Sequence, residues 1–307
     1  MILREYAAAI ALAGAALAAS PVVTASPAPV SGATTERHHY TMNARVRPLL
    51  LFWISKSNVG DAMTLRRQDG AETEYSLLIG SDPQRAPRKI NRWGYIDEDV
   101  KGSNATVIGL MTESDEDSIE QAEASIKQQD GQRVFKVIRG SIAADQAQSV
   151  VTSVPAPSTY NFRHVNTLLE LARRDRHDGR TRSVTLPAGT RPGFLSALAD
   201  LIHAHVQQWK TASRVDAGAP ITYAYHGKIY QLRATKTERR SHAIASQFEI
   251  RNIVNGELTR FSMTYGTEGA LAEVPLTVSF QPKWWLEVEI VLDDSTQGPA
   301  VASESHP

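Results

Sequence analysis

Apolar and polar residues alternate along several stretches in the second half of the chain, and turn residues separate these stretches in pairs. Alternation with a period of two is typical of strands that bury one face. The Asn255-Gly256 pair predicts a hairpin turn, and a two-residue loop there sets Ile250 opposite Phe261. The same register sets Phe248 opposite Met263. Turn chemistry and alternation are independent signals, and both predict this pairing.

Two further turns give the same kind of pattern. A two-residue loop at His226-Gly227 pairs Tyr223 with Tyr230. A three-residue loop at 281–283 pairs Val278 with Leu286, whereas a two-residue loop would pair Val278 with a charged residue. Six antiparallel strands follow, and we expect a meander because consecutive strands usually lie side by side.

Two helices are predicted before these strands. The first begins at Val165 and ends in arginines, where cations complement the helix dipole. The second runs from about Pro192 to Lys210 with a broad apolar stripe, which includes His205 but not His203. We expect this helix to cover the apolar face of the sheet, which gives an α+β fold.

The opposite face of the sheet is expected to be charged and exposed. The predicted register places Arg251 opposite Arg260, with Trp285 on the same face. Two facing arginines are unfavourable unless a carboxylate or an anion lies between them. These three residues are therefore candidates for binding an anionic ligand, and a solvated charged face is the alternative.

The first half of the chain is also rich in predicted strands. A loop of Asp69-Gly70-Ala71 predicts a hairpin that pairs Leu65 with Tyr75, Met63 with Leu77 and Arg66 with Glu74. The acidic stretch 114–117 predicts the start of one short helix. Acidic residues are favoured at a helix start, so this cluster is explained without a bound metal. Further strands are expected at 49–54, 107–111 and 133–138.

The loop between Ser81 and Tyr95 carries cations beside aromatic side chains, an arrangement that can bind anions, phosphorylated lipids or glycans. An exposed connector with a buried tryptophan is the alternative. The candidate binding residues in this loop are Arg85, Arg88, Lys89, Arg92, Trp93 and Tyr95.

The first 25 residues resemble an export signal. Arg4 precedes an apolar run, Ala7–Ala19, and cleavage rules fit after Ala18 or after Ala25. The run is shorter than the roughly 20 apolar residues that cross a bilayer. We expect a periplasmic or secreted protein with no transmembrane segment after cleavage.

Composition changes suggest where the chain divides. We expect a disordered lead-in at 26–40, a β-rich domain at 41–154 with one short helix, a second domain at 159–294, and a disordered tail at 295–307. The proline-rich segment Val154–Ser158 marks the boundary between the two domains, although one sheet shared by both halves is the alternative.

Composition limits the possible partners and chemistry. Lys and Arg total 33 and Asp and Glu total 33, so no net charge favours nucleic acid. The chain has no cysteine, which excludes disulfides and thiolate chemistry. Common hydrolase, metalloprotease and nucleotide-binding motifs are absent, so we expect neither a metal nor another cofactor.

Two groups of residues carry a family resemblance. The stretch Phe52–Leu65 resembles the opening strands of uncharacterised exported bacterial β-rich proteins, and the stretches 261–265, 274–276 and 281–285 resemble their closing strands. Some of those families are similar to the periplasmic lipoprotein carriers, whose fold is a curved antiparallel half-barrel covered by helices. The resemblance implies an apolar cavity between sheet and helix that holds a lipid-like ligand.

Three functions remain open on the sequence alone. The first is a non-catalytic exported protein that binds a lipid-like or anionic small ligand or an envelope protein. The second is a secreted hydrolase, for which the positions to test are His242, Glu268, Glu287 and Glu289. The third is an interaction module that uses the 81–95 loop.

Overall fold

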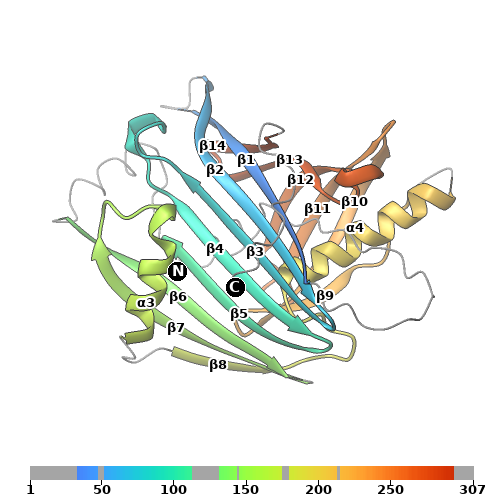
Figure 1. Ribbon diagram of the computed structural model, residues 1–307, viewed down its shortest axis with the longest axis horizontal. Helices are drawn as coiled ribbons and strands as arrows, with labels where there is room; N and C mark the ends of the chain where they lie inside the picture. Colours follow the sequence, from blue (N-terminus) through green and yellow to red (C-terminus); the bar gives the residue numbers. More distant parts are fainter. Residues whose placement is uncertain are drawn as a thin grey trace, which may run out of the picture.

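The structure is a computed structural model that describes residues 33–47, 52–112, 131–143, 145–174, 180–212 and 215–293. In these ranges, fourteen strands form a single antiparallel sheet that curves strongly but does not close (Figure 1). The strands are β1 (Thr34–Val46), β2 (Ile54–Asp69), β3 (Glu72–Ser81), β4 (Trp93–Lys101), β5 (Asn104–Thr112), β6 (Gln132–Ala143), β7 (Gln146–Pro157), β8 (Arg180–Thr185), β9 (Ile221–Tyr225), β10 (Lys228–Arg239), β11 (Ala243–Asn252), β12 (Leu258–Gly266), β13 (Pro275–Lys283) and β14 (Leu286–Leu292).

The strand order is β8-β7-β6-β5-β4-β3-β2-β1-β14-β13-β12-β11-β10-β9. Every neighbouring pair is consecutive in the chain except β1 and β14, which join the two halves in the middle of the sheet. The expected meander over β9–β14 is confirmed. The segment predicted to separate two domains lies largely within β7, and strands on both sides of it belong to the one sheet. The division into domains stays a prediction.

Two helices, α3 (Val165–Arg174) and α4 (Phe194–Thr211), cover opposite faces of the curved sheet. Helix α3 packs on β6 and β7, and α4 contacts β9, β10, β3 and β4 (Figure 1). Short 3-10 turns lie at η2 (Pro87–Lys89), η3 (Phe162–His164) and η4 (Gly269–Leu271). The fold is therefore mostly sheet, and the expected α+β class holds only in the sense that helices cover its faces.

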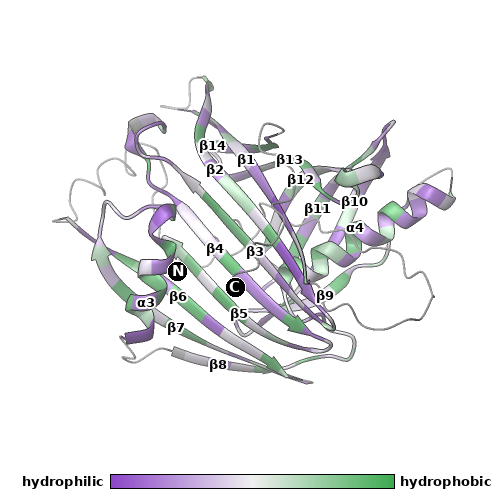
Figure 2. Cartoon of the chain, in the orientation of Figure 1, coloured by the Kyte–Doolittle hydropathy of each residue, from purple (hydrophilic) through white to green (hydrophobic). Residues whose placement is uncertain are grey.

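Each face of the sheet has its own core. The larger core lies on the inner side and includes α4 with the inward residues of β1–β5 and β9–β14. The smaller core joins α3 and Phe162 to the outward residues of β4–β7, such as Trp93 and Phe135. Figure 2 shows the apolar positions distributed along strands and helices of both halves. Since both sides of β4–β7 are covered, these strands bury alternate residues on two faces.

Both predicted helices are confirmed within a few residues. His205 is fully buried, and its Nδ1 lies 2.6 Å from the Tyr265 hydroxyl. His203 is partly exposed and contacts the carboxylate of Glu273 at 2.7 Å. The apolar stripe therefore separates the two histidines as expected. None of the helices in the described ranges is long and apolar enough to cross a bilayer.

Most predictions for the ends of the chain cannot be compared with the described residues. The predicted export signal, the predicted disordered tail at 295–307 and the short helix predicted after residue 114 lie outside the described residues. The expected lead-in at 26–40 is wrong in part, because β1 begins at Thr34. Residues 34–40 pair with residues 62–68 of β2, and Tyr40 also pairs with Leu292 of β14. Pairing with neighbours overrides the polar composition of this segment.

The hairpin registers are predicted with mixed success. The His226-Gly227 turn pairs Tyr223 with Tyr230, as expected. The pairing predicted for Asn255-Gly256 is wrong by two residues, because the Asn252 N–H donates to the Glu257 carbonyl and closes a four-residue loop. Phe248 then faces Phe261, so the buried face is unchanged.

Two other hairpin registers are also corrected. Strand β13 continues to Lys283, and Val278 pairs with Ile290 rather than Leu286. A bulge between Phe280 and Lys283 turns Trp285 inward, so the expectation that it faces solvent is wrong. In the first half, a two-residue turn shifts the predicted hairpin by one residue. In the observed register Thr64 and Arg66 are buried, and Met63 and Leu65 are half-buried.

Candidate ligand-binding cavity

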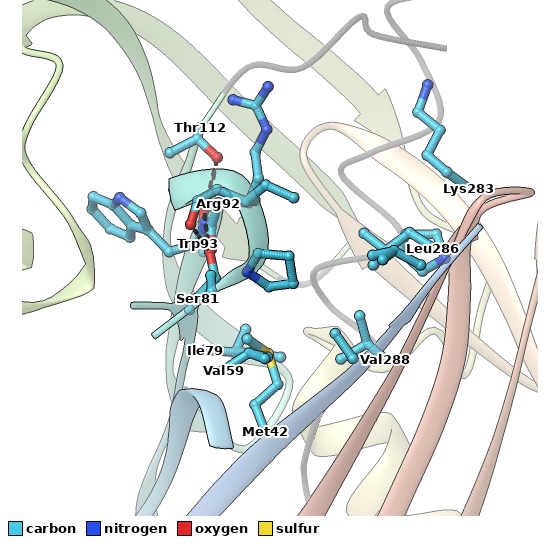
Figure 3. Close-up of a pocket in the computed structure, with 18 of the residues that line it drawn as sticks. Met42, Val59, Ile79, Ser81, Arg92, Trp93, Thr112, Lys283, Leu286 and Val288 are labelled. Carbon is cyan, nitrogen blue, oxygen red and sulfur yellow. Dashed lines mark hydrogen bonds between the residues drawn. The ribbon is translucent and has the colours of Figure 1, made fainter. Parts of the chain in front are cut away.

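An apolar cavity of about 130 Å³ lies between the two halves of the sheet (Figure 3). It is surrounded by the ends of β1, β3, β5 and β13 and by the starts of β4 and β14. Strand β2 and the η2 turn complete the wall. Strands β1 and β14 are the central pair that joins the halves, so the cavity lies where they meet. Its walls include Met42, Ala44, Val46, Ile79, Leu286 and Val288.

The two side-chain hydroxyls of the wall are bonded within the protein. The Ser81 hydroxyl donates to the Ile90 carbonyl at 2.8 Å, and the Arg92 N–H donates to the same hydroxyl at 2.9 Å. The Thr112 hydroxyl bonds to the backbone of Trp93. Because satisfied groups gain little from a new partner, the wall presents mainly apolar atoms to a ligand.

The mouth of the cavity differs from its floor. Figure 3 shows the side chains of Arg92 and Lys283 extending on one side, away from Met42 and Val59. Trp285 lines the cavity, is 4% exposed, and has an indole N–H with no hydrogen-bond partner in the structure. An unbonded buried N–H costs on the order of 1–3 kcal/mol, so a ligand oxygen that accepts from it would be favoured.

The cations of the 81–95 loop do not act as one group. Arg85 is ion-paired with Asp61 and, at 3.2 Å, with Asp82. Lys89 lies at the exposed end of η2, and the side chain of Arg88 lies outside the described residues. Arg92 lines the cavity instead. Of the three loop cations whose side chains are described, Arg92 is therefore the one that lines the cavity.

The aromatic residues of that loop face the other way. The Trp93 ring is buried in the α3 core, 5.7 Å from the Phe135 ring, and points away from the cavity in Figure 3. Tyr95 packs against the same core, and burial raises its pKa to about 12. The alternative of a connector with a buried tryptophan fits these two residues better.

Arg251 and Arg260 are exposed, and neither lines the cavity. The corrected register pairs Arg260 with Glu249, whose carboxylate it contacts at 3.2 Å. Arg251 lies 3.9 Å from the same carboxylate, and Arg233 lies 2.7 Å from it. The expected pair of facing arginines is replaced by an arginine–glutamate ladder, which satisfies the predicted need for a carboxylate.

The space between α4 and the sheet is packed, in contrast to the cavity that the family resemblance implies. Leu198, Ile202 and Val206 of α4 have no exposed surface, and no residue of α4 lines the cavity. The buried Glu98 of β4 fixes the start of this helix by accepting three backbone hydrogen bonds. The cavity lies at the other end of the inner core.

The positions considered for hydrolysis are only partly assembled. His242 and Glu268 form an ion pair, and both are exposed. Glu287 pairs with Arg45 at 2.8 Å, and Glu289 accepts a hydrogen bond from Asn43. In the described part of the chain, no three His, Asp or Glu side chains cluster in a way that could hold a metal ion.

Sequence reasoning missed most residues of the cavity. Met42, Ala44 and Val46 alternate along β1 with polar residues, and this pattern could have identified their shared face. No strand was predicted for their segment, which lies between the expected lead-in at 26–40 and the strand expected at 49–54. What the pattern could not reveal is that this face meets the end of β14.

Comparison with known proteins adds little. No protein-family model matches this chain, and no curated protein matches it. A solved structure from Brucella abortus is described as a beta-barrel-like protein of a domain of unknown function, DUF1849. The alignment covers 84% of this chain and 95% of that chain, with 6% identity and a TM-score of 0.36.

Proposed function

We propose that this chain is an exported, non-catalytic binding protein whose cavity takes the apolar part of a lipid-like ligand. The observation that carries the proposal is the apolar cavity beside the β1–β14 pair, with cationic side chains at its mouth. The signal-like sequence at 1–25 supports export to the periplasm or the medium.

The size of the cavity limits what it can hold. A cavity of roughly 150 Å³ admits a benzene ring, so this one suits on the order of six carbon atoms. At about 0.8 kcal/mol for each buried methylene group, such a segment contributes about 5 kcal/mol. That free energy corresponds to a dissociation constant between about 1 mM and 1 µM. The ligand is therefore bound by a short apolar segment.

The mouth favours an acidic or oxygen-rich head group. Arg92 and Lys283 lie where the ligand would leave the apolar wall, so a carboxylate or phosphate can approach them. Trp285 also lines the wall, and its buried N–H has no partner among the described residues, so we propose that a ligand oxygen accepts from it. A fatty acid or a related amphiphile combines these features.

Binding of the fluorescent probe N-phenyl-1-naphthylamine, and its displacement by decanoate, tests this proposal. Ala44→Phe fills the cavity from β1, so we expect at least about tenfold weaker binding of both molecules. Val150→Phe adds the same ring at an exposed position of β7 and should bind like the wild type. Thermal unfolding of each variant verifies that it is folded.

A second variant tests the donor. Trp285→Phe removes the N–H, so we expect decanoate to bind about fivefold more weakly, the equivalent of one hydrogen bond of about 1 kcal/mol. The affinity for the neutral probe should fall less. If the wild type binds neither molecule and native mass spectrometry shows no co-purified lipid, the proposal is wrong.

A further inference from the structure

Large apolar side chains are exposed beside the mouth of the cavity. Phe52, Ile54 and Trp284 are 59%, 44% and 46% exposed. Single exposed apolar residues are common on protein surfaces, but two aromatic rings and an isoleucine at one location are unusual. Such a group is typical of a surface that meets a partner.

Strand pairing places Ile54 beside the cavity wall, and Phe52 and Trp284 each lie two residues before a strand that pairs with β1. Val46, near the end of β1, pairs with Ile54 on one side and with Leu286 on the other. The Arg47 N–H donates to the Trp285 carbonyl at 2.8 Å, so the β13–β14 turn lies beside the end of β1. Because Val46, Trp285 and Leu286 line the cavity, the exposed residues flank its mouth.

Cations accompany these apolar residues. Lys56 pairs with Ala44, a wall residue, so it lies on the cavity side of β2. Lys283 lines the mouth from the end of β13. The carboxylate on the adjoining part of β14, Glu287, is paired with Arg45. The described side chains at this end of the sheet therefore include two lysines beside one paired carboxylate, although the whole chain has no net charge.

We propose that Phe52, Ile54, Lys56, Lys283 and Trp284 form a mouth surface that docks on an anionic phospholipid bilayer. Tryptophan favours the depth of the lipid head groups, because its ring is amphipathic. Each lysine near an anionic surface contributes on the order of 1 kcal/mol. Charge complementarity and continuity with the apolar cavity select a lipid surface over a neutral protein partner.

Docking in this orientation directs the cavity mouth toward the bilayer. A lipid-like ligand then moves between bilayer and cavity without its apolar part crossing water, which avoids about 0.8 kcal/mol for each exposed methylene group. The inference goes beyond ligand binding, since docking uses residues outside the cavity floor. An experiment can therefore contradict membrane docking without contradicting ligand binding, and the reverse.

Co-sedimentation of the full chain with lipid vesicles tests the mouth surface. We expect the wild type to bind vesicles of phosphatidylglycerol and phosphatidylcholine, to bind pure phosphatidylcholine more weakly, and to dissociate as salt increases. The double variant Phe52→Ser, Trp284→Ser should lose at least about tenfold in affinity for either vesicle. Lys56→Glu, Lys283→Glu should lose the preference for phosphatidylglycerol.

The matched control is Val134→Ser, Val150→Ser, which removes two exposed apolar side chains from β6 and β7. It should bind vesicles like the wild type. Ala44→Phe, which fills the cavity, should also still bind them, and this result separates docking from ligand binding. Equal vesicle binding by the wild type and the Phe52→Ser, Trp284→Ser variant would overturn the inference. So would a lipid-free dimer, seen by sedimentation velocity, that this variant dissociates.

Discussion

At the scale of single residues, Glu98 connects the sheet to its inner helix. Its Oε1 accepts hydrogen bonds from the N–H groups of Phe194 and Leu195 at 2.7 and 3.0 Å, and its Oε2 accepts from Ser196 at 3.1 Å. The helix begins after Gly193, which has a φ of 145°. A Cβ at Gly193 would lie 2.2 Å from the Glu98 carboxylate, so both backbone conformation and space require glycine there.

Burial makes this contact depend on pH. Loss of hydration raises the pKa of Glu98 from 4.5 to about 7, and the three N–H donors limit the rise. The folded protein then binds more protons than the unfolded chain between these two values, so this carboxyl group makes stability fall as pH rises through that window. The full effect is about 3 kcal/mol.

Glu98→Gln should remove this part of the pH dependence, because an amide does not titrate. We expect the wild type and the variant to have similar free energies of unfolding at about pH 4.5. As pH rises from there to about 7, the free energy of unfolding should fall less for the variant than for the wild type. Urea unfolding across the range measures both. Asp97, whose pKa burial raises to about 6, titrates in both proteins, and its charge also raises the pKa of Glu98 in the wild type. Identical pH profiles would show that Glu98 does not titrate in this range.

At the scale of elements, the β9–β10 hairpin brings one edge of the sheet against the other half. A Cβ built at Gly109 of β5 would lie 2.8 Å from the Tyr225 hydroxyl of β9. A Cβ built at Gly227, in the turn, would lie 2.7 Å from the Ser149 hydroxyl of β7. The sheet therefore overlaps itself without hydrogen bonding between its edge strands β8 and β9.

Gly109→Ala should disturb this overlap. The added methyl group must displace the buried Tyr225 side chain, and we expect a loss of about 1–3 kcal/mol in stability. Gly140→Ala on β6 is the matched control, because its Cβ would meet no atom closer than 3.4 Å. Denaturant unfolding of the two variants measures the difference. Equal stability would mean that the hairpin moves away from β5 at little cost.

At the scale of the whole molecule, the β1–β14 pair joins the two halves. Seven residues of β1, from Tyr40 to Val46, pair with the seven residues of β14 from Leu292 to Leu286. The inner core also draws residues from both halves and from α4. Unfolding one half would therefore expose apolar surface of the other.

We expect a single cooperative unfolding transition for the full chain. Tryptophan fluorescence reports on both halves, since Trp93 lies in the first and Trp209 and Trp285 lie in the second. Its midpoint should coincide with that of far-ultraviolet circular dichroism. Two separated transitions would instead support the two domains that the proline-rich segment predicts.

The sequence by itself determined the local elements of this protein. The 3.6-residue stripe fixed α4 and the burial of His205, and alternation fixed which face of β11–β13 is apolar. Local signals suffice here because a helix face and a strand face depend only on neighbouring residues. Registers were harder: a shift of two leaves the buried face unchanged, so alternation alone could not exclude the wrong loop at Asn255-Gly256.

Only the tertiary structure decided where the candidate site lies. Met42 on β1 and Val288 on β14 are 246 positions apart in the sequence, and no local pattern predicts that their strands lie side by side. The bulge that turns Trp285 inward, and the carboxylate that Glu98 offers to α4, likewise depend on contacts between distant segments. Sequence patterns describe faces, whereas a cavity forms from the way in which faces meet.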